Sequence, residues 1–286
     1  MLQNMQTGGI SMDNIGLIGT GNMGGMLAEV MLEQNSVPPE RLYIYNRTVE
    51  RNKNFQASHP LVHAAGSIKE LLAATDIIFI CVRPKQYGPL LHELQKYLTM
   101  EHIVATITSP VLLEDLERLP ARRVVRTVPT IANKTGTAPL LLTFGSHWTE
   151  KEKVVFREWL GTFSDPVPLT DKTLRVSSDI VSCGPAFMSY LLQCFIEAAA
   201  DETDIEYGEA EKLAEKMMMA YGRLLSEKHY SLPELCQKVN VPGGVTGEGL
   251  EVLSRFSAGM FEELIGRTHQ KYEDDKEEMA SLFVEE

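Results

Sequence analysis

Near its start the chain reads Ile15-Gly16-Leu17-Ile18-Gly19-Thr20-Gly21-Asn22-Met23-Gly24. The apolar run at residues 14–18 predicts a buried strand, and the apolar spacing of residues 23–34 predicts a helix. The turn between them has the spacing G-x-G-x-x-G. Gly19 would make the tight turn, Gly21 would admit a pyrophosphate close to the backbone, and Gly24 would let the helix pack closely on the strand. The candidate cofactor-binding residues of this turn are Gly19, Thr20, Gly21, Asn22, Met23 and Gly24.

This glycine spacing is a weak signal by itself, but its place between a strand and a helix predicts dinucleotide binding. The pyrophosphate would lie at the helix N-terminus, where unpaired N–H groups and the helix dipole favour anions. The alternative is a glycine turn that binds no ligand.

Short apolar runs and helical patterns continue to alternate up to about residue 169. Further strands are expected at residues 42–45, 62–64, 77–82, 103–106, 123–126 and 140–143, and helices at residues 49–58, 68–74, 84–97 and 112–119. This order predicts an α/β fold, a Rossmann domain with a doubly wound, mostly parallel sheet.

From residue 172 onward no segment has the pattern of a strand. Helices are expected at residues 185–200, 208–229 and 246–265, followed by a charged tail. We therefore expect a nucleotide-binding Rossmann domain at residues 12–170 and an all-helical domain at residues 171–286. Met12 directly precedes the first strand, so residues 1–11 are expected to be a disordered extension outside the fold.

The composition disfavours several classes of function. The net charge of −12 disfavours binding to nucleic acid, and no apolar run approaches the ~18–20 residues that span a bilayer, so neither partner is expected. The four cysteines form no C-x-x-C pair, and the seven histidines form no H-E-x-x-H motif. This pattern favours reduced thiols in a cytoplasmic protein and no metal site.

The second expected strand ends in Tyr45-Asn46-Arg47-Thr48. A site specific for NAD usually places an acidic residue here, on the ribose 2′-hydroxyl. No acid is present, and the guanidinium of Arg47 could instead pair with a 2′-phosphate, with Asn46 and Thr48 as hydrogen-bond donors. The sequence thus predicts NADP(H) as the cofactor. In the alternative interpretation, Arg47 is a solvated surface residue.

The fourth expected strand leads into Val82-Arg83-Pro84-Lys85. Because the carboxyl ends of the strands face the ligand crevice of a doubly wound sheet, Val82, Arg83 and Pro84 are further candidate cofactor-binding residues. Arg83 and Lys85 could equally be surface charges.

The helical half contains the loop Pro242-Gly243-Gly244-Val245-Thr246, just before an expected helix. Successive free N–H groups at such a place can hold a carboxylate, and the Thr246 hydroxyl could add a donor. The alternative is an ordinary loop in which Thr246 caps the helix.

Together these segments resemble the pyrroline-5-carboxylate reductase family, over residues 13–265. The resemblance rests on residues 19–24, Val82-Arg83-Pro84, Arg126-Thr127-Val128-Pro129, Gly184-Pro185-Ala186 and, most specifically, Pro242-Gly243-Gly244-Val245-Thr246. It implies reduction of the ring C=N of 1-pyrroline-5-carboxylate to L-proline with NAD(P)H. It also implies a homodimer or larger homo-oligomer, with the active site at the domain and subunit interface.

By position, the resemblance assigns the backbone amides of Gly243, Gly244 and Val245 to the substrate carboxylate. It assigns the Thr246 hydroxyl to the imine nitrogen, which makes Thr246 the candidate catalytic residue. That contact favours the iminium, the better hydride acceptor. The rest of catalysis would be orientation of the nicotinamide over the imine carbon.

The sequence departs from the family at several positions. The usual Pro-Asn-Thr-Pro reads Pro129-Thr130-Ile131-Ala132, the serine before Pro-Gly-Gly is Val241, and Gly-Ser-Gly-Pro-Ala-Tyr reads Ser182-Cys183-Gly184-Pro185-Ala186-Phe187. Each lost donor to a charged substrate costs on the order of 1.5–3 kcal/mol. The substituted pattern resembles a reductase-like subgroup encoded beside bacterial late-competence genes.

Two other functions therefore remain open. One is an oxidoreductase of the same build that acts on another cyclic imine or on a hydroxy acid. The related β-hydroxyacid dehydrogenases use a lysine on the first long interdomain helix, and residues 185–200 contain no lysine, which counts against them. The other is a nucleotide-binding protein, linked to competence, that has lost catalysis.

Overall fold

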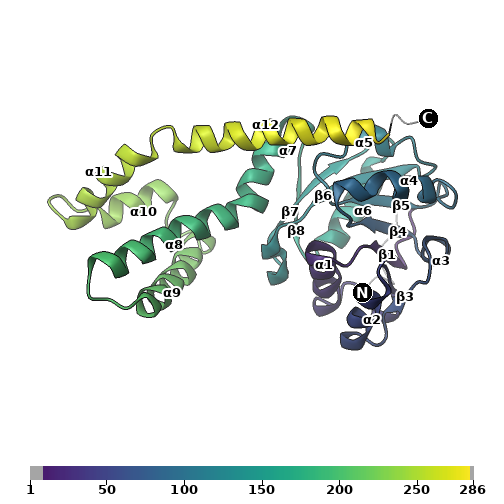
Figure 1. Cartoon of the computed structure of the whole chain (residues 1–286), viewed down its shortest axis with the longest axis horizontal. Helices are drawn as coiled ribbons and strands as arrows, with labels where there is room; N and C mark the ends of the chain where they lie inside the picture. The colour runs from purple at the N-terminus through teal and green to yellow at the C-terminus, as the bar shows by residue number, and fades with distance from the viewer. Residues whose placement is uncertain (1–8, 284–286) are drawn as a thin grey trace. The chain divides into compact units, whose positions relative to one another are not determined.

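The computed structural model describes residues 9–283 of the 286-residue chain (Figure 1). The strands are β1 (Ile15–Ile18), β2 (Leu42–Tyr45), β3 (His63–Ala64), β4 (Ile77–Ile80), β5 (Ile103–Thr106), β6 (Arg123–Val128), β7 (Pro139–Phe144) and β8 (Asp165–Pro168). The helices are α1 (Asn22–Glu33), α2 (Val49–Ser58), α3 (Ile68–Ala74), α4 (Tyr87–Leu94), α5 (Leu113–Leu116), α6 (Glu150–Leu160), α7 (Asp171–Ser178), α8 (Gly184–Glu202), α9 (Tyr207–Ser226), α10 (Leu232–Val239), α11 (Val245–Ser257) and α12 (Met260–Ser281).

The strands form one sheet in the order β3-β2-β1-β4-β5-β6-β7-β8. Strands β1 to β6 run parallel, and Ile18 of β1 lies opposite both Tyr45 of β2 and Ile80 of β4. The doubly wound parallel sheet is thus confirmed, although β7 pairs antiparallel to β6 and β8 follows the direction of β7. The strand order reverses between β1 and β4, and open α/β sheets bind their ligands outside the carboxyl ends at such a switch point.

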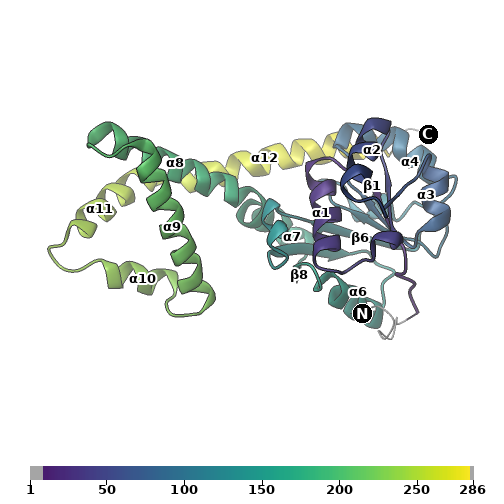
Figure 2. The same cartoon turned by 90° about the horizontal axis from the view of Figure 1, so that it is seen from below.

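Helices cover both faces of the sheet (Figure 2). On one face, α1 and α6 bury side chains such as Met31 and Trp159 against the strands. On the other face, α3, α4 and α5 pack on the sheet, and Met279 near the end of α12 joins the same core. Burial of continuous apolar runs on both faces is the main force that holds such a parallel sheet together.

The start of the described chain already belongs to the fold. Ile10 and Met12 are 3% and 4% exposed and lie in the core beneath α1 and α6. The extension expected at residues 1–11 is therefore wrong at Ile10, because burial removes this apolar side chain from water. Residues 1–8 of the expected extension lie outside the described residues.

The helix expected at residues 185–200 begins much earlier. Helix α7, a π-helical turn at Asp179–Cys183 and α8 form one continuous helix. Pro185 has no N–H, and its ring excludes the carbonyl of the residue four positions earlier, so an ordinary α-helix cannot continue through it. The wider π turn accommodates this proline without ending the helix.

The helix expected at residues 246–265 is instead two helices. Ala258 leaves the helical conformation, and Gly259 adopts a φ of +78°, which favours glycine. Helix α12 then begins at Met260 and runs through the charged tail. Strand β8 and the helices α6 and α10 are not among the expected elements. A capping box nevertheless opens each of the two helices, Thr149 with Glu152 in α6 and Ser231 with Glu234 in α10.

The continuous helix Asp171–Glu202 contains an 18-residue stretch with a mean hydropathy of 1.3, so by length and composition alone it could cross a membrane. The expectation that no segment approaches this length is therefore wrong. Only 11% of that 18-residue stretch is buried within the described chain. Its apolar side chains need a covering that the residues 9–283 of one chain do not supply.

The described chain forms two compact units. The first, here called the sheet domain, comprises residues 9–183 and 268–283, and the second, the helical domain, comprises residues 184–267. The expected boundary after residue 170 places the whole C-terminal part in the helical domain. In the structure, the end of α12 belongs to the sheet domain, because Tyr272 and Met279 are buried in its core.

A buried ion pair fixes α6 to the sheet. The guanidinium of Arg123 in β6 donates twice to one oxygen of Glu152, at 2.8 and 2.6 Å, and the other oxygen accepts from Thr149. Burial of Glu152 works against ionisation, but the hydrogen bonds from Thr149 and the charge of Arg123 outweigh it and lower the pKa of this carboxyl.

Glu152→Ala is expected to lower the free energy of unfolding by about 3 kcal/mol, because it leaves the Arg123 charge buried and unpaired. Glu150→Ala on the exposed side of the same helix is the control and should change it by less than ~0.5 kcal/mol. Since the folded pKa is depressed, the Glu152 contribution is complete above its unfolded pKa of about 4.3 and is lost as the pH falls below it. Urea unfolding at pH 7 and pH 3 measures both effects, and an equal cost at the two pH values would contradict this account.

Candidate functional site

The glycine turn between β1 and α1 lies at the switch point of the sheet. Gly19 has a φ of +97°, and a Cβ there would stand 2.9 Å from the carbonyl oxygen of Cys81. A Cβ on Gly24 would collide with the carbonyl oxygen of Gly19 and would stand 2.7 Å from the Cβ of Cys81. These two glycines therefore allow α1 to approach the ends of β1 and β4.

Gly21 plays a different part, because it borders open space. The atom nearest to a Cβ built there is a terminal nitrogen of Arg51, 3.9 Å away. Gly21 is also the N-cap of α1 and carries no side chain over the first N–H groups of that helix. Asn22 is exposed and Met23 packs against the core. The turn thus offers a backbone surface with room for a pyrophosphate, as the spacing predicts.

Asn46 at the end of β2 supports the glycine turn. Its side-chain oxygen accepts from the N–H of Thr20 at 2.7 Å, and its amide donates to the Thr20 hydroxyl at 2.7 Å and to Asn52 at 2.8 Å. Both amide hydrogens are therefore engaged. The expectation that Asn46 donates to a 2′-phosphate does not agree with this arrangement, which makes Asn46 a support of the turn instead.

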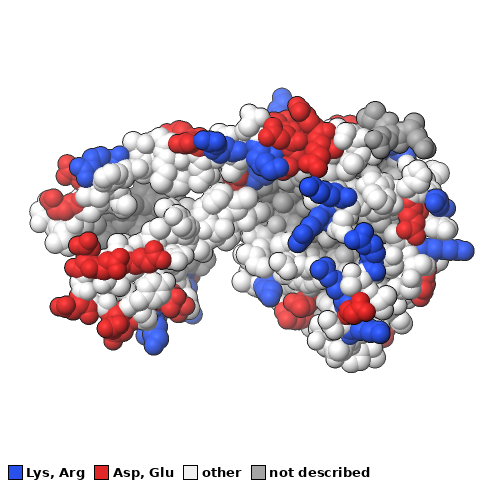
Figure 3. Space-filling model, in the orientation of Figure 1, with Lys and Arg blue, Asp and Glu red and all other residues white. Residues whose placement is uncertain are grey.

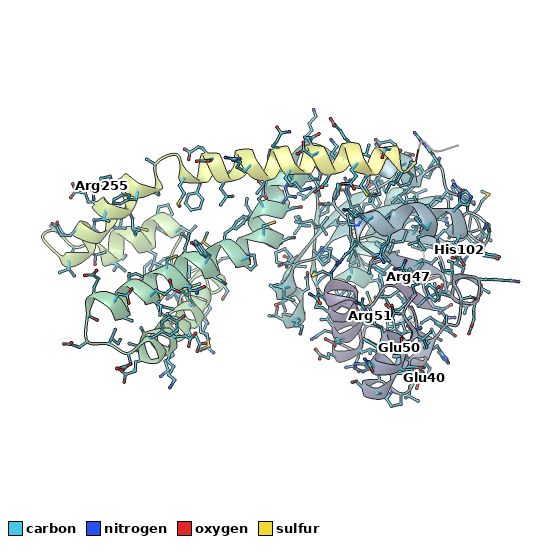
Figure 4. All side chains as sticks on the ribbon, viewed as in Figure 1. Glu40, Arg47, Glu50, Arg51, His102 and Arg255 are labelled. Carbon is cyan, nitrogen blue, oxygen red and sulfur yellow. The ribbon has the colours of Figure 1, made fainter. Side chains whose placement is uncertain are left out.

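Two arginines stand beside the glycine turn. Arg47 and Arg51 are exposed, and within residues 9–283 neither has an ion-pair partner. Figure 4 shows both on the same face of the sheet domain, and Figure 3 shows basic side chains gathered on that face. Between them, Thr48 precedes α2 with a side chain that makes no capping hydrogen bond. Three donor side chains are thus available to an anion.

Arg51 is not among the cofactor-binding residues expected from the sequence. It stands one helical turn after Arg47, and this spacing across the start of a helix was the available signal.

The segment after β4 forms the other side of the glycine turn. A methyl group of Val82 stands 3.2 Å from the Cβ position of Gly19, and the Val82 carbonyl accepts from Thr108 at 3.4 Å. Pro84 begins a short 3₁₀ turn at Pro84–Gln86, and Arg83 and Lys85 are exposed. Val82 therefore borders the glycine turn directly. Arg83 and Lys85 could still either contact the cofactor or be surface charges.

The end of β5 lies at the same edge of the sheet, next to β4. Thr106 shares a 2.6 Å hydrogen bond with the buried hydroxyl of Tyr87. The loop that follows is held by buried Arg126, which donates to the Val111 carbonyl at 2.8 Å and pairs with Asp171. Cys81 lies at this edge as well, and burial raises the pKa of its thiol, which disfavours the nucleophilic thiolate.

The candidate substrate loop belongs to the helical domain. Gly243 has a φ of +74°, and the N–H of Gly244 donates to the Val241 carbonyl at 2.9 Å to close a turn. Gly244 is the N-cap of α11, so Val245 and Thr246 are its first two residues. The amides of Gly243, Val245 and Thr246 remain for an anion, whereas that of Gly244 is engaged. Thr246 stands inside the first turn, so it is not the capping threonine of the alternative interpretation.

Two positions that depart from the resembled family have different surroundings. Thr130 is 1% exposed, and its N–H donates to the side chain of Asn133 at 2.8 Å. Val241 is 57% exposed and stands beside Gly244 in the candidate substrate loop. The first change is therefore built into the packing of the sheet domain, and only the second lies on an open surface.

Comparison with known proteins agrees with both halves of this description. Residues 171–279 match the family model of pyrroline-5-carboxylate reductase dimerisation, and residues 14–110 match that of NADP oxidoreductase, coenzyme F420-dependent. The chain is 41% identical to ComE operon protein 4 of Bacillus subtilis over 269 residues, which cover 94% of this chain and 98% of that protein.

Proteins named as pyrroline-5-carboxylate reductases share fewer identical residues with this chain than ComE operon protein 4 does. The chain is 27% identical to pyrroline-5-carboxylate reductase 3 of Bacillus subtilis over 263 residues, 92% of this chain and 96% of that protein. The crystal structure of the Plasmodium falciparum pyrroline carboxylate reductase with NADP bound has the same fold, with a TM-score of 0.79 at 19% identity over 94% of this chain and 100% of that chain.

The glycine turn at the switch point, the helical half and these similarities lead to one conclusion. The chain belongs to the pyrroline-5-carboxylate reductase family of NAD(P)H-dependent oxidoreductases that act on CH–NH bonds, and within it to the group of ComE operon protein 4.

Proposed function

We propose that this protein uses NADPH to reduce the cyclic imine 1-pyrroline-5-carboxylate to L-proline. The observation that carries the proposal is the loop Pro242–Thr246, which opens α11 with a left-handed glycine, free N–H groups and a hydroxyl in its first turn. That arrangement matches an anionic substrate that also contains an imine nitrogen.

The cofactor preference follows from the charges around the glycine turn. Arg47 and Arg51 offer two guanidinium groups without ion-pair partners within the described residues, and no acid is present where a ribose 2′-hydroxyl would be bound. A 2′-phosphate gains charge-assisted hydrogen bonds there, whereas a hydroxyl gains much less. NADPH supplies the hydride when it is bound.

The residues of this chain do the rest by binding and orientation. The amides of Gly243 and Val245 hold the substrate carboxylate, and the hydroxyl of Thr246 bonds to the imine nitrogen and favours the protonated form. A protonated imine accepts a hydride more readily because the electron pair of the C=N bond then ends on a neutral nitrogen. Water supplies the proton, and orientation supplies most of the rate.

A second function deserves a test because of Val241. An exposed valine stands where the resembled family has a serine that contacts the carboxylate, so one donor is missing from the loop. This change favours either a different cyclic imine or binding of the nucleotide without turnover.

The deciding experiment is oxidation of NADPH at 340 nm in the presence of pyrroline-5-carboxylate, with NADH in parallel. Turnover that is faster with NADPH supports the proposal. NADPH binding without turnover on pyrroline-5-carboxylate, followed by turnover on another cyclic imine, would assign the second function.

Arg51→Ala is expected to weaken NADPH binding by about 10- to 100-fold, because it removes a charge-assisted contact worth ~1.5–3 kcal/mol. Binding of NADH, which has no 2′-phosphate, should change by less than about threefold. Lys53→Ala on the same helix is the matched control, since Lys53 is also exposed. Fluorescence titration of both nucleotides measures the difference, and equal losses for NADPH and NADH would contradict the assignment.

Thr246→Val is expected to lower kcat/KM for the imine by about 10- to 100-fold, because it removes the hydroxyl and preserves the shape. Thr246→Ser keeps the donor and should retain most of the activity. NADPH affinity should stay unchanged in both variants. If valine and serine behaved alike in steady-state assays, the hydroxyl would have no part in the reaction.

The helical domain also supports a homodimer. Its only buried apolar cluster is small, formed by Ile196, Ala210 and Ala214. Large apolar side chains of α8, α9 and α11 are exposed, among them Phe195 at 69% and Phe256 at 70%. Such a surface is stable when a second copy covers it.

Light scattering at micromolar concentration is expected to give at least about 64 kDa, twice the chain mass of 31.9 kDa. Phe195→Glu should shift the mass towards one chain because it places a charge in the apolar contact. Glu197→Gln, on the same helix, is the control. A mass of one chain for the unmodified protein would overturn the homodimer.

A further inference from the structure

The glycine turn is tied to the end of β2 by the side chain of Asn46, which is 6% exposed. The N–H of Thr20 can only donate, so the group that faces it at 2.7 Å is the amide oxygen of Asn46. The amide nitrogen of Asn46 then faces the hydroxyl of Thr20, to which it donates at 2.7 Å. One amide therefore holds both the N–H and the hydroxyl of the residue between Gly19 and Gly21.

Asn52 completes this arrangement from helix α2. Its side chain is 7% exposed, and its oxygen accepts the second amide hydrogen of Asn46 at 2.8 Å. Without this acceptor a buried N–H of Asn46 would lose its partner, which is costly, and the amide would be free to turn away from Thr20. Among the described residues, Asn52 makes no hydrogen bond to the glycine turn itself, so it acts on Thr20 through Asn46.

The same contacts leave the hydroxyl of Thr20 with a hydrogen to donate. A hydroxyl has one donor and two acceptor sites, and Asn46 uses one of the acceptor sites. Within residues 9–283 the Thr20 hydroxyl donates to no other group, and the half-buried Thr20 precedes Gly21, which borders open space. A phosphate oxygen at this place would accept a strong, charge-assisted hydrogen bond.

We propose that Asn52 is a positioning residue for binding of the pyrophosphate of NADP(H). By holding the amide of Asn46, Asn52 orients the Thr20 hydroxyl as a donor to a phosphate oxygen. The inference rests on the nucleotide site of the proposed function, but it concerns binding and needs no turnover. Because the pyrophosphate is common to NADPH and NADH, Asn52 acts on both nucleotides, whereas the preceding residue, Arg51, acts on the 2′-phosphate of NADPH alone.

The binding test compares Asn52→Leu with Asn54→Leu by fluorescence titration of NADPH and NADH. Asn54 is an exposed asparagine of the same helix, so it is the matched control. Asn52→Leu is expected to weaken binding of both nucleotides by about 5- to 20-fold, and the ratio of the two dissociation constants should stay within about twofold. Asn54→Leu should change neither constant by more than about twofold. A loss confined to NADPH, or no loss for either nucleotide, would overturn the proposal.

Two further substitutions test the route through Thr20. Asn52→Asp keeps the oxygen that accepts from Asn46 and should bind NADH within about threefold of the unmodified protein. Thr20→Val removes the hydroxyl and should weaken binding of both nucleotides by about 10- to 100-fold, whereas Thr20→Ser keeps the donor. Combined with Asn52→Leu, Thr20→Val should cost clearly less than the product of the two single losses, because both break one chain of hydrogen bonds. Losses that simply multiply would contradict action through Thr20.

Phosphorus NMR of bound NADPH separates positioning from a general loss of structure. In Asn52→Leu, or in Asn52→Ala if the leucine variant does not fold, the pyrophosphate signals should shift while the 2′-phosphate signal keeps its position. Arg51→Ala should give the reverse. Movement of both kinds of signal in the Asn52 variant would indicate a merely structural role and overturn the proposal, as would failure of the unmodified protein to bind either nucleotide. If that protein binds NADPH but does not reduce pyrroline-5-carboxylate, the proposed function fails by itself, and the spectra still decide the role of Asn52.

Discussion

The approach of α1 to the ends of β1 and β4 is the constraint on which the sheet domain depends. This approach is possible only because Gly24 has no side chain, since a Cβ there would overlap the carbonyl oxygen of Gly19. This contact places the N-terminus of α1 at the switch point of the sheet, where its free N–H groups face open space. The same contact brings α1 against the side chain of Cys81, whose thiol has a pKa raised by burial. One steric requirement thus sets both the packing and the anion-binding surface.

The two domains bury their apolar side chains to different extents. The sheet domain has an apolar core on each face of its sheet and places even Ile10 and Met279 in those cores. The helical domain buries little more than Ile196, Ala210 and Ala214. An apolar helix whose composition would suit a membrane is, in this family, part of a dimerisation domain. Exposure of such a face in one chain is therefore consistent with assembly.

Several polar residues of the candidate site act on the backbone instead of on a ligand. Asn46 uses both amide hydrogens to hold Thr20 and Asn52, and Gly244 uses its N–H to close the turn with Val241. Buried Arg126 holds the loop after β5 and pairs with Asp171 at the start of α7. In the proposed function, recognition is left to the remaining amides, to the exposed Arg47 and Arg51 and to the half-buried Thr246. Divided roles of this kind keep a site in place before its ligand arrives.

The glycine turn, the parallel strands, the change to an all-helical half and the family could all be predicted from the sequence. Each of them rests on local periodicity or on a motif whose geometry a few residues fix. Other features appeared only in the folded chain: Arg51 stands beside the same glycine turn as Arg47, Asn46 is already hydrogen-bonded, and the helix passes Pro185 through a π turn. The end of α12 also belongs to the sheet domain. These features depend on contacts between residues far apart in the chain, such as Asp179 with Thr268, and local periodicity contains no information about them.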